Sequence, residues 1–320
     1  MAAPTSILCL HQLQPGLQKV ITDIDPAIKL TIIDPEDIHT INEAHSDTNI
    51  ILAWGQQNID PYLQFLPNLR WIQTFTAGVD QILSPMVADK KIIVTNTRGI
   101  HGIPISEYIF ANLLSYYRKL PKLQEMQKNK QWAKVTSNEI FGKTIGIVGL
   151  GSIGREIAKR AKAFGLEVLA NKKQHTDELF IDKLYTDREL ETMLPKCDIV
   201  VLSLPLTPET KYSFDYNKFK LMKKNACLIN ISRGSVLVES DLIRALQEKE
   251  FEHAILDVFE EEPLPPTSPL WEIPNITLTP HISASTPYYM ERATHLFAEN
   301  VKQFIQDKSL VNIIDPQKGY

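Results

Sequence analysis

The sequence is poor in cysteine and in long apolar runs. Its three cysteines are Cys9, Cys197 and Cys227, and each lies in an apolar context. So few cysteines, and an odd number of them, argue against a disulfide framework or a metal site. We therefore expect buried free thiols in a reducing, cytoplasmic setting. The apolar run at residues 7–10 is far too short for a membrane span, and residues 1–5 lack the charged region of a signal peptide. We therefore expect no membrane partner.

The chain also lacks an excess of basic charge. Its formal net charge is -4 and its pI is near 6.1, whereas a nucleic-acid binder normally carries a basic face, so we expect no nucleic-acid partner. No Ser-His-Asp pattern or nucleophile elbow is present, which disfavours hydrolysis. Six histidines show no metal-ligand spacing: His11, His39, His45, His175, His253 and His295.

What the chain does have is an alternation of short apolar runs with helical patterns, over a length that suits about two domains. Such alternation predicts parallel βαβ units, and continuous apolar character fits strands covered on both faces. The strands expected in a first unit are 6–10, 29–33, 50–53, 71–74 and 92–94. Those expected in a second unit are 144–148, 167–170, 199–202, 227–231, 254–256 and 276–278. The predicted fold class is α/β, with two doubly wound parallel sheets.

Two long helical patterns lie outside this alternation. Residues 104–127 predict one helix, which could bridge the domains or join a dimer contact, with a plain core helix about as plausible. Residues 286–306 predict another, followed by an extended segment at 311–314. We expect this tail to return to the first domain. The boundaries are then 1–100 plus 288–320 for a discontinuous first domain and 101–287 for the second.

A glycine-rich loop carries the strongest local signal. Gly149, Gly151 and Gly154 form Gly-x-Gly-x-x-Gly between a predicted strand and a predicted helix, the context that supports dinucleotide binding. The first glycine permits the tight turn, the second lets the backbone approach a pyrophosphate, and the third allows the helix to pack on the strand. Ser152 and Ile153 would present N–H groups of the helix start to the phosphates.

The end of the following strand bears on the choice of cofactor. NAD-selective sites place an acidic residue here to accept hydrogen bonds from the adenine ribose. This chain has Asn171, Lys172 and Lys173 instead, and no carboxylate at that point. The lysines would attract a 2′-phosphate, which predicts a preference for NADP(H). The alternative is that both lysines are solvated and that NAD(H) is accepted.

Three polar residues follow apolar runs in the last third of the chain: Arg233, Glu262 and His281. Carboxyl ends of parallel strands are where such sheets present reactive side chains. An arginine fork can bind a carboxylate and polarise a carbonyl, and a histidine can deliver a proton. A neighbouring glutamate favours the charged imidazole and fixes the ring. The set fits reduction of a 2-oxo acid.

Several motifs together resemble the D-isomer-specific 2-hydroxyacid dehydrogenase family. They are the glycine loop, Leu204 to Thr210, Asn230 to Gly234, Asp257 to Leu264, Thr279-Pro280-His281, Thr76 to Asp80 and Thr95 to Gly99. The similarity runs over nearly the whole chain. It is strongest to a glyoxylate/hydroxypyruvate reductase-like branch, since Glu262 replaces the glutamine of formate dehydrogenases and Lys172 the aspartate of NAD-using members.

The resemblance implies roles for further residues. Arg233, Glu262 and His281 would be catalytic, with Arg233 and His281 also contacting substrate. N–H groups of Ala77, Gly78 and Val79 would bind the substrate carboxylate. Asp257 would contact the nicotinamide amide, Ile231 would lie beside the nicotinamide, and Leu204, Pro205 and Thr210 would line the adenine side. The resemblance also implies a Rossmann-type domain inserted into a flavodoxin-like domain, a small 2-oxo or 2-hydroxy acid substrate, and a homodimer.

For four other polar and aromatic residues, the sequence allows both a functional and a structural role. His101 could act in the cleft or cap the helix that follows it. Trp54, Tyr288 and Tyr289 could shape the substrate pocket, or belong to the core or to a dimer contact.

A different class of function also fits the same fold. The chain could be a nucleotide-sensing binding protein of the transcriptional corepressor type. We favour the reductase because all three catalytic residues are present and the sequence contains no low-complexity segment.

Overall fold

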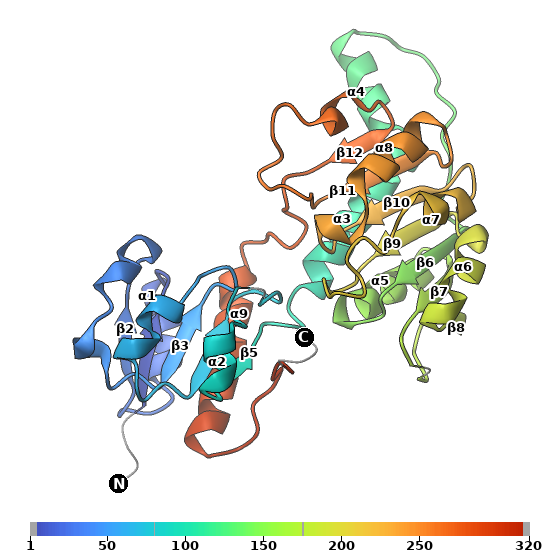
Figure 1. The fold of residues 1–320 in the computed structure, drawn as a ribbon. Coiled ribbons are helices and arrows are strands. Elements are labelled where there is room, and N and C mark those ends of the chain that lie inside the picture. The colour runs from blue at the N-terminus through green and yellow to red at the C-terminus, as the bar shows by residue number, and fades with distance from the viewer. Residues whose placement is uncertain (1–4, 80, 175, 316–320) are drawn as a thin grey trace. The chain divides into compact units, whose positions relative to one another are not determined.

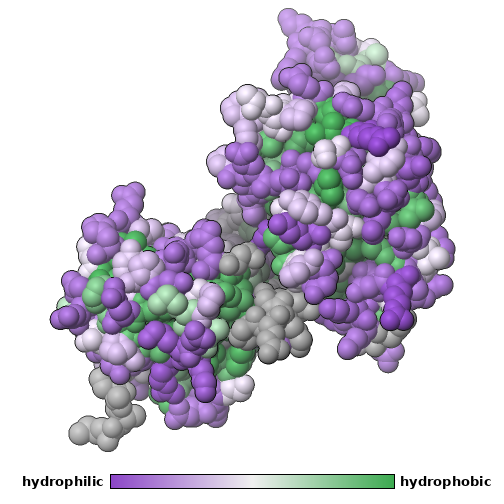
Figure 2. All heavy atoms as spheres, in the orientation of Figure 1, coloured by the Kyte–Doolittle hydropathy of each residue, from purple (hydrophilic) through white to green (hydrophobic). Residues whose placement is uncertain are grey.

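The computed structural model describes residues 5–79, 81–174 and 176–315. The chain divides into two compact units, Met1–His101 with Thr286–Tyr320, and Gly102–Ser285 (Figure 1). On the face shown in Figure 2, the surface of each unit is mostly hydrophilic, with small scattered apolar patches. In the described parts of the chain, no helix combines the length and apolar character needed to cross a membrane.

The first unit contains a five-stranded sheet in its described residues, with strand order β2-β1-β3-β4-β5 and every pair parallel. The strands are β1 (Ser6–Cys9), β2 (Lys29–Ile32), β3 (Ile50–Ala53), β4 (Trp71–Thr74) and β5 (Ile93–Thr95). The helices are α1 (Pro15–Thr22), α2 (Pro85–Asp89) and α9 (Tyr289–Ile305), with 3₁₀ turns η1 (Pro35–Thr40), η2 (Glu43–His45) and η3 (Asp60–Phe65). This is the flavodoxin-like strand order that the resemblance implies.

Apolar side chains along β1 alternate between the two faces of the sheet, and both faces are covered by other elements. Leu8 packs with Leu63 and Val87 on one face, whereas Ile7 packs with Ile21 of α1 and Phe297 of α9 on the other. Figure 1 shows α9, near the end of the chain, lying beside these N-terminal strands. The expected return of the tail is thus observed. Beyond α9, an antiparallel bridge pairs Ile313 of the tail with Thr95 of β5.

The second unit contains a seven-stranded parallel sheet in its described residues, with strand order β12-β11-β10-β9-β6-β7-β8. The strands are β6 (Thr144–Val148), β7 (Glu167–Asn171), β8 (Lys183–Tyr185), β9 (Ile199–Leu202), β10 (Cys227–Asn230), β11 (His253–Leu256) and β12 (Ile276–Leu278). The helices are α3 (Gly102–Tyr117), α4 (Leu120–Lys128), α5 (Ser152–Ala163), α6 (Leu190–Met193), α7 (Tyr216–Leu221) and α8 (Glu239–Gln247), with 3₁₀ turns η4 (Asp187–Glu189), η5 (Leu194–Lys196), η6 (Gly234–Val236) and η7 (Pro269–Glu272). The strand order reverses between β6 and β9, the switch point of a Rossmann-type sheet, so the predicted fold class is confirmed.

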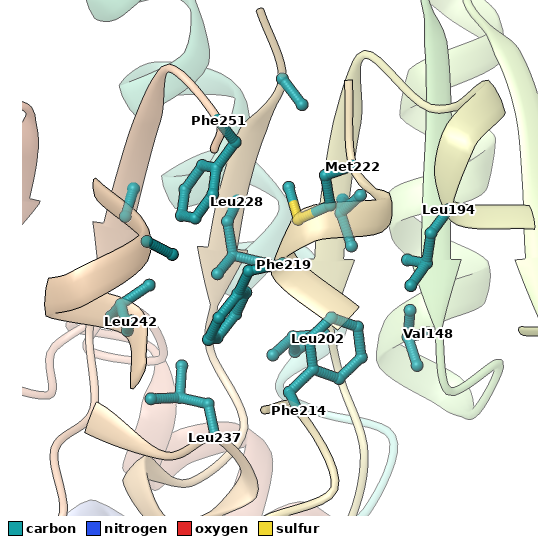
Figure 3. Close-up of a cluster of buried hydrophobic side chains, with 14 of the residues drawn as sticks. Val148, Leu194, Leu202, Phe214, Phe219, Met222, Leu228, Leu237, Leu242 and Phe251 are labelled. Carbon is teal, nitrogen blue, oxygen red and sulfur yellow. The ribbon is translucent and has the colours of Figure 1, made fainter. Parts of the chain in front are cut away.

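Helices cover both faces of this sheet. On one face, Ile109 of α3 and Ile157 of α5 pack against Ile147 and Ile229. On the other, Phe214, Phe219 and Phe251 pack with Leu228 and Leu242 beneath α7 and α8 (Figure 3). Neighbouring rings in this cluster have centroids 6.1 and 5.8 Å apart.

Two sequence predictions need correction. The single helix expected over 104–127 is two helices, because Lys119 takes a left-handed conformation with φ 55° between α3 and α4. Ile109 and Leu113 place α3 in the core of the second unit, as the core-helix alternative expected. Strand β8 is missing from the predictions, since it has three residues and begins with an exposed lysine.

Candidate active site

Three neighbouring parallel strands, β10, β11 and β12, bring the three polar candidates to one edge of the sheet. Arg233 follows β10, Glu262 follows β11 and His281 follows β12. Because β11 pairs in parallel with both neighbours, the carboxyl ends of all three strands lie at the same edge. Segments that are far apart in sequence therefore contribute to one region.

The imidazole of His281 is held by a carboxylate. Its Nδ1 lies 2.7 Å from Oε2 of Glu262, while Oε1 of Glu262 accepts a hydrogen bond from the Phe259 N–H at 2.9 Å. Both side chains keep solvent contact, with 49% and 35% of their surfaces exposed. Since the carboxylate engages Nδ1, Nε2 is the ring atom at which His281 can exchange a proton with a ligand.

Asp257 anchors the loop that carries His281. This residue is fully buried directly after β11, and its Oδ1 accepts from the Thr279 hydroxyl at 2.6 Å and from the Ile282 N–H at 2.9 Å. Its Oδ2 accepts from the Ser283 N–H at 2.8 Å. Tyr108 of α3 adds a 2.6 Å hydroxyl contact to Thr279. One carboxylate thus holds the Thr279 hydroxyl before His281 and two backbone amides after it. The sequence analysis expected Asp257 to contact the nicotinamide instead.

The loop that carries Arg233 is also tightly held. The side-chain amide of Asn230 donates to the Arg233 carbonyl at 3.0 Å and its oxygen accepts from the Ser232 hydroxyl at 2.7 Å. A Cβ added at Gly234 would lie 1.8 Å from the Phe259 carbonyl carbon. Glycine therefore lets the Arg233 loop approach the backbone of Phe259, whose N–H holds Glu262.

The glycine loop joins β6 to α5. Gly149 has φ 96°, and a Cβ there would lie 2.6 Å from the Ser203 carbonyl oxygen. A Cβ at Gly154 would lie 2.6 Å from the Gly149 carbonyl oxygen, whereas one at Gly151 would meet no described atom within 4 Å. The first and third glycines are thus needed for packing. Gly151, at the N-cap of α5, leaves open space where phosphates meet the N–H groups of Ser152 and Ile153.

With this geometry in place, comparisons with known proteins show what the chain is similar to. Residues 110–283 match the family model described as D-isomer specific 2-hydroxyacid dehydrogenase, NAD binding domain. A glyoxylate/hydroxypyruvate reductase B of Escherichia fergusonii is 31% identical over 321 residues, covering 98% of each chain.

Solved structures extend the similarity. A D-isomer specific 2-hydroxyacid dehydrogenase family protein of Aeromonas salmonicida has a TM-score of 0.88 at 34% identity, covering 98% of this chain and 99% of its own. A probable 2-hydroxyacid dehydrogenase of Rhizobium etli, in complex with NADP, HEPES and L(+)-tartaric acid, has a TM-score of 0.82 at 27% identity, covering 100% of each chain.

The chain belongs to the D-isomer-specific 2-hydroxyacid dehydrogenase family. It is accordingly an oxidoreductase, and its second unit carries the nicotinamide-dinucleotide-binding domain of that family. Its relatives place it in the glyoxylate/hydroxypyruvate reductase-like branch.

In this dehydrogenase, the end of β7 fits a polar ligand. Asn171 is 3% exposed, and its Nδ2 is buried without a hydrogen-bond partner among the described residues. Such an orphaned donor is costly in a folded protein unless a ligand or water completes it. Asn171 lies at the strand end where the cofactor's adenine ribose is bound in this fold, so the residues present fit a dinucleotide.

Lys172, the next residue, has a partner that sequence reasoning missed. Its Nζ donates to Oε1 of Glu178 at 2.7 Å, and Arg155 of α5 binds the same carboxylate through Nε and Nη2 at 2.7 and 2.6 Å. The strand end therefore does have a carboxylate beside it, supplied from the following loop. Lys173 is exposed. Arg155, directly after Gly154, was a sequence signal for this cluster that went unused.

Residues expected to line the adenine and nicotinamide sides follow β9 and β10. The Thr210 hydroxyl donates to the Pro205 carbonyl at 2.6 Å, closing the loop after β9. A Cβ at Gly149 would lie 3.1 Å from Leu204, so this loop borders the glycine turn. Ile231 is 6% exposed within the core next to α5.

The expected substrate loop lies in the first unit, after β4. The Ala77 carbonyl accepts from the Asn96 amide at 2.7 Å, and the Gly78 carbonyl accepts from the Thr76 hydroxyl at 2.6 Å. The Val79 carbonyl accepts from the Ile82 N–H at 3.0 Å. These bonds fix the conformation of the loop. Asp80, part of the motif, lies outside the described residues.

The remaining aromatic candidates belong to the first unit and divide into two groups. Tyr289 donates to the Phe75 carbonyl at 2.7 Å, contacts Nε2 of His101 at 2.9 Å, and stacks with Trp54 at 6.1 Å between ring centroids. Tyr288, in contrast, is 57% exposed. Tyr289 and His101 therefore tie α9 to the strand ends that carry the loop at 77–79.

Proposed function

We propose that this enzyme reduces small 2-oxo acids to D-2-hydroxy acids. The observation that carries the proposal is the 2.7 Å contact between Nδ1 of His281 and Oε2 of Glu262, at the same sheet edge as Arg233. The relative in Escherichia fergusonii is named for glyoxylate and hydroxypyruvate, which are small 2-oxo acids.

The chemistry divides among three side chains. The guanidinium of Arg233 binds the substrate carboxylate and polarises the carbonyl oxygen through its planar fork. The nicotinamide, when bound, supplies the hydride. His281 gives the proton on Nε2 to the carbonyl oxygen, and Nδ1–H continues to donate to Glu262. The carboxylate of Glu262 orients the ring and stabilises its charged form before the transfer.

Other residues bind rather than react. The N–H groups of Ala77, Gly78 and Val79 donate to the substrate carboxylate, a role supported by carbonyls that are already engaged within the first unit. Asp257 contacts the nicotinamide amide while holding the His281 loop. Leu204, Pro205 and Thr210 line the adenine, and Ile231 lies beside the nicotinamide. The first unit is the substrate domain and the second the cofactor domain.

NADPH is the preferred cofactor in this proposal, with NADH also accepted. Lys172 and Arg155 form a cationic site at the end of β7, the position where a 2′-phosphate is recognised, and the relative in Rhizobium etli was solved with NADP. Measuring kcat/KM for NADPH and for NADH tests the preference. A higher value for NADH would reject it.

We also propose a homodimer in a reducing compartment such as the cytosol. Leu120 and Leu123 of α4 are 43% and 41% exposed, and Trp132 after it is fully exposed, so each offers apolar surface that a second copy could cover. Cys9, Cys197 and Cys227 are buried free thiols. Analytical ultracentrifugation of the wild type and of Trp132→Ala measures the oligomeric state. A monomeric wild type would contradict the proposed dimer.

The reaction itself is tested by NADPH oxidation with glyoxylate, hydroxypyruvate, pyruvate, branched oxo acids and phenylpyruvate. We expect turnover with the smaller members and formation of the D-hydroxy acid. If NADPH binds but none of these acids oxidises it, the corepressor-like sensor becomes the better description.

A further inference from the structure

Glu178 occupies an anion site built from side chains of two segments. Its Oε1 accepts from Arg155 Nη2 at 2.6 Å, Lys172 Nζ at 2.7 Å and the Thr176 hydroxyl at 2.8 Å. Its Oε2 accepts from Arg155 Nε at 2.7 Å. The side chain of Glu178 is only 7% exposed, although it comes from the loop between β7 and β8.

The donors of this site match what a phosphate monoester needs. A phosphate offers several acceptor oxygens and close to two negative charges, which an arginine fork and an ammonium group bind well. The cluster also lies at the end of β7, beside the orphaned Nδ2 of Asn171. In this fold the second strand of the sheet ends at the adenine ribose of the cofactor.

We propose that Glu178 determines the choice between NADPH and NADH, because its carboxylate occupies the anion site that the 2′-phosphate of NADPH takes. The inference rests on the proposed binding of the adenine ribose at the end of β7. With NADH, the carboxylate stays and accepts a hydrogen bond from the ribose 2′-hydroxyl. With NADPH, the carboxylate leaves Arg155 and Lys172 to the phosphate.

Protonation does not relieve this competition near neutral pH. Hydrogen bonds from Arg155, with smaller help from Lys172 and Thr176, lower the pKa of Glu178 to about 2. The carboxylate is therefore charged whenever the enzyme works, and two anions cannot share the site without repulsion. Binding of NADPH must include the separation of Glu178 from both cations, a step that NADH does not require.

A purely structural role for Glu178 makes the opposite prediction. If the carboxylate only orients Arg155 and Lys172, its removal would leave both cations misplaced and would weaken NADPH binding. The sign of the change in NADPH affinity therefore shows whether Glu178 competes with the 2′-phosphate or only orients Arg155 and Lys172.

The test compares the wild type, Glu178→Gln and the matched control Asp177→Asn, which removes one charge from the adjacent exposed residue. Dissociation constants are measured by calorimetry for NADPH and NADH, and for adenosine 2′,5′-bisphosphate and AMP, which probe the ribose site without turnover. We expect Glu178→Gln to raise the preference for the 2′-phosphorylated ligand in each pair by about tenfold, and Asp177→Asn to change it by less than about twofold. Adding Lys172→Ala to Glu178→Gln should abolish the increased preference for the 2′-phosphorylated ligand.

An unchanged or reduced preference in folded Glu178→Gln would overturn the proposal, and Glu178→Ala repeats the measurement if the glutamine variant does not fold. The outcome is separable from the proposed function. If the wild type prefers NADH, the NADPH preference fails, but a tenfold change on substitution still assigns Glu178 as the determinant. If AMP does not bind, the adenine ribose site lies elsewhere than at the end of β7, and the assignment of Glu178 is rejected.

Discussion

Nδ1 of His281 lies 2.7 Å from Oε2 of Glu262, although the two residues follow different strands. Glu262 is fixed from its other side by the Phe259 N–H, and the His281 loop is fixed by Asp257. The backbone of the His281 loop and the Glu262 carboxylate are thus each held by a further contact, and the contact between them orients the ring. The arrangement fits the preorganised proton donor that the proposed reduction of a carbonyl requires.

Replacement of His281 by alanine should remove the proton donor and leave cofactor binding intact. We expect kcat for a 2-oxo acid to fall by about 10²–10⁴-fold, the usual contribution of general acid catalysis. The dissociation constant of NADPH should change little. His295→Ala, at an exposed position on α9, is the matched control. A His281→Ala enzyme that keeps most of its kcat would refute the assignment.

Glu262→Gln tests the second half of the contact. The amide can still orient the ring but carries no negative charge, so kcat for a 2-oxo acid should fall by about tenfold or more. Steady-state kinetics under saturating substrate measure the loss. A Glu262→Gln enzyme with the kcat of the wild type would mean that Glu262 acts on ring orientation alone.

Arg233→Lys should weaken both recognition and catalysis of the substrate. Lysine keeps the charge but loses the planar fork, so we expect kcat/KM to fall by about 10–100-fold, equivalent to roughly 1.5–3 kcal/mol. Steady-state kinetics with glyoxylate measure the change. Arg118→Lys serves as control, because it makes the same exchange at an exposed position directly after α3. Equal behaviour of the two variants would exclude Arg233 as the anchor.

Local features of the chain could be read from the sequence, as could the pairing of Glu262 with His281 at neighbouring strand ends, whereas other contacts over distance could not. The apolar runs of β6 and β10 and the turn at Gly149 depend on residues within a few positions, so pattern and glycine placement predict them. The break at Lys119 was invisible because no glycine or proline occupies the αL position itself.

The site shows the same division. Strand-end placement of Arg233 and His281 follows from a parallel sheet, but the hold of Asp257 on the His281 loop spans 26 residues. Likewise, Glu178 folds back onto Lys172 and Arg155 through a loop without regular periodicity. Such contacts are decided by tertiary packing, which composition and spacing do not encode.

Substitutions at the second and third glycines of the nucleotide loop should separate effects on folding from effects on binding. An alanine Cβ at Gly151 would meet no described atom within 4 Å, so we expect Gly151→Ala to keep the wild-type Tm. It would nevertheless occupy the space of the pyrophosphate, and the dissociation constant of NADPH should rise at least about tenfold. Thermal unfolding and calorimetry on one preparation check both effects.

Gly154→Ala provides the contrast. Its Cβ would lie 2.6 Å from the Gly149 carbonyl oxygen and 3.2 Å from Ile147, so the variant should lose about 1–3 kcal/mol of stability. A Gly151→Ala protein as unstable as Gly154→Ala would show that the middle glycine serves the fold instead of the ligand.

His253 should make the cofactor unit sensitive to mild acid. Its ring stacks on Tyr116 with centroids 4.3 Å apart, Nε2 contacts the Thr277 hydroxyl at 3.0 Å, and burial lowers the pKa of His253 to about 4. The unfolded chain binds this proton near pH 6.5 and the folded chain near 4. Stability from the neutral ring is therefore complete above pH 6.5 and is lost as the pH falls to 4, by up to about 3 kcal/mol.

Substitution of His253 by glutamine isolates this contribution, because glutamine can still contact Thr277 but does not titrate. The difference between the free energies of unfolding at pH 7 and at pH 4.5, measured with urea, should be smaller in His253→Gln than in the wild type. His295→Gln, at an exposed position, should keep the wild-type difference. If His253→Gln and the wild type lose the same free energy between these pH values, the folded protein already accommodates a charged ring at this position, and acid sensitivity must come from other groups.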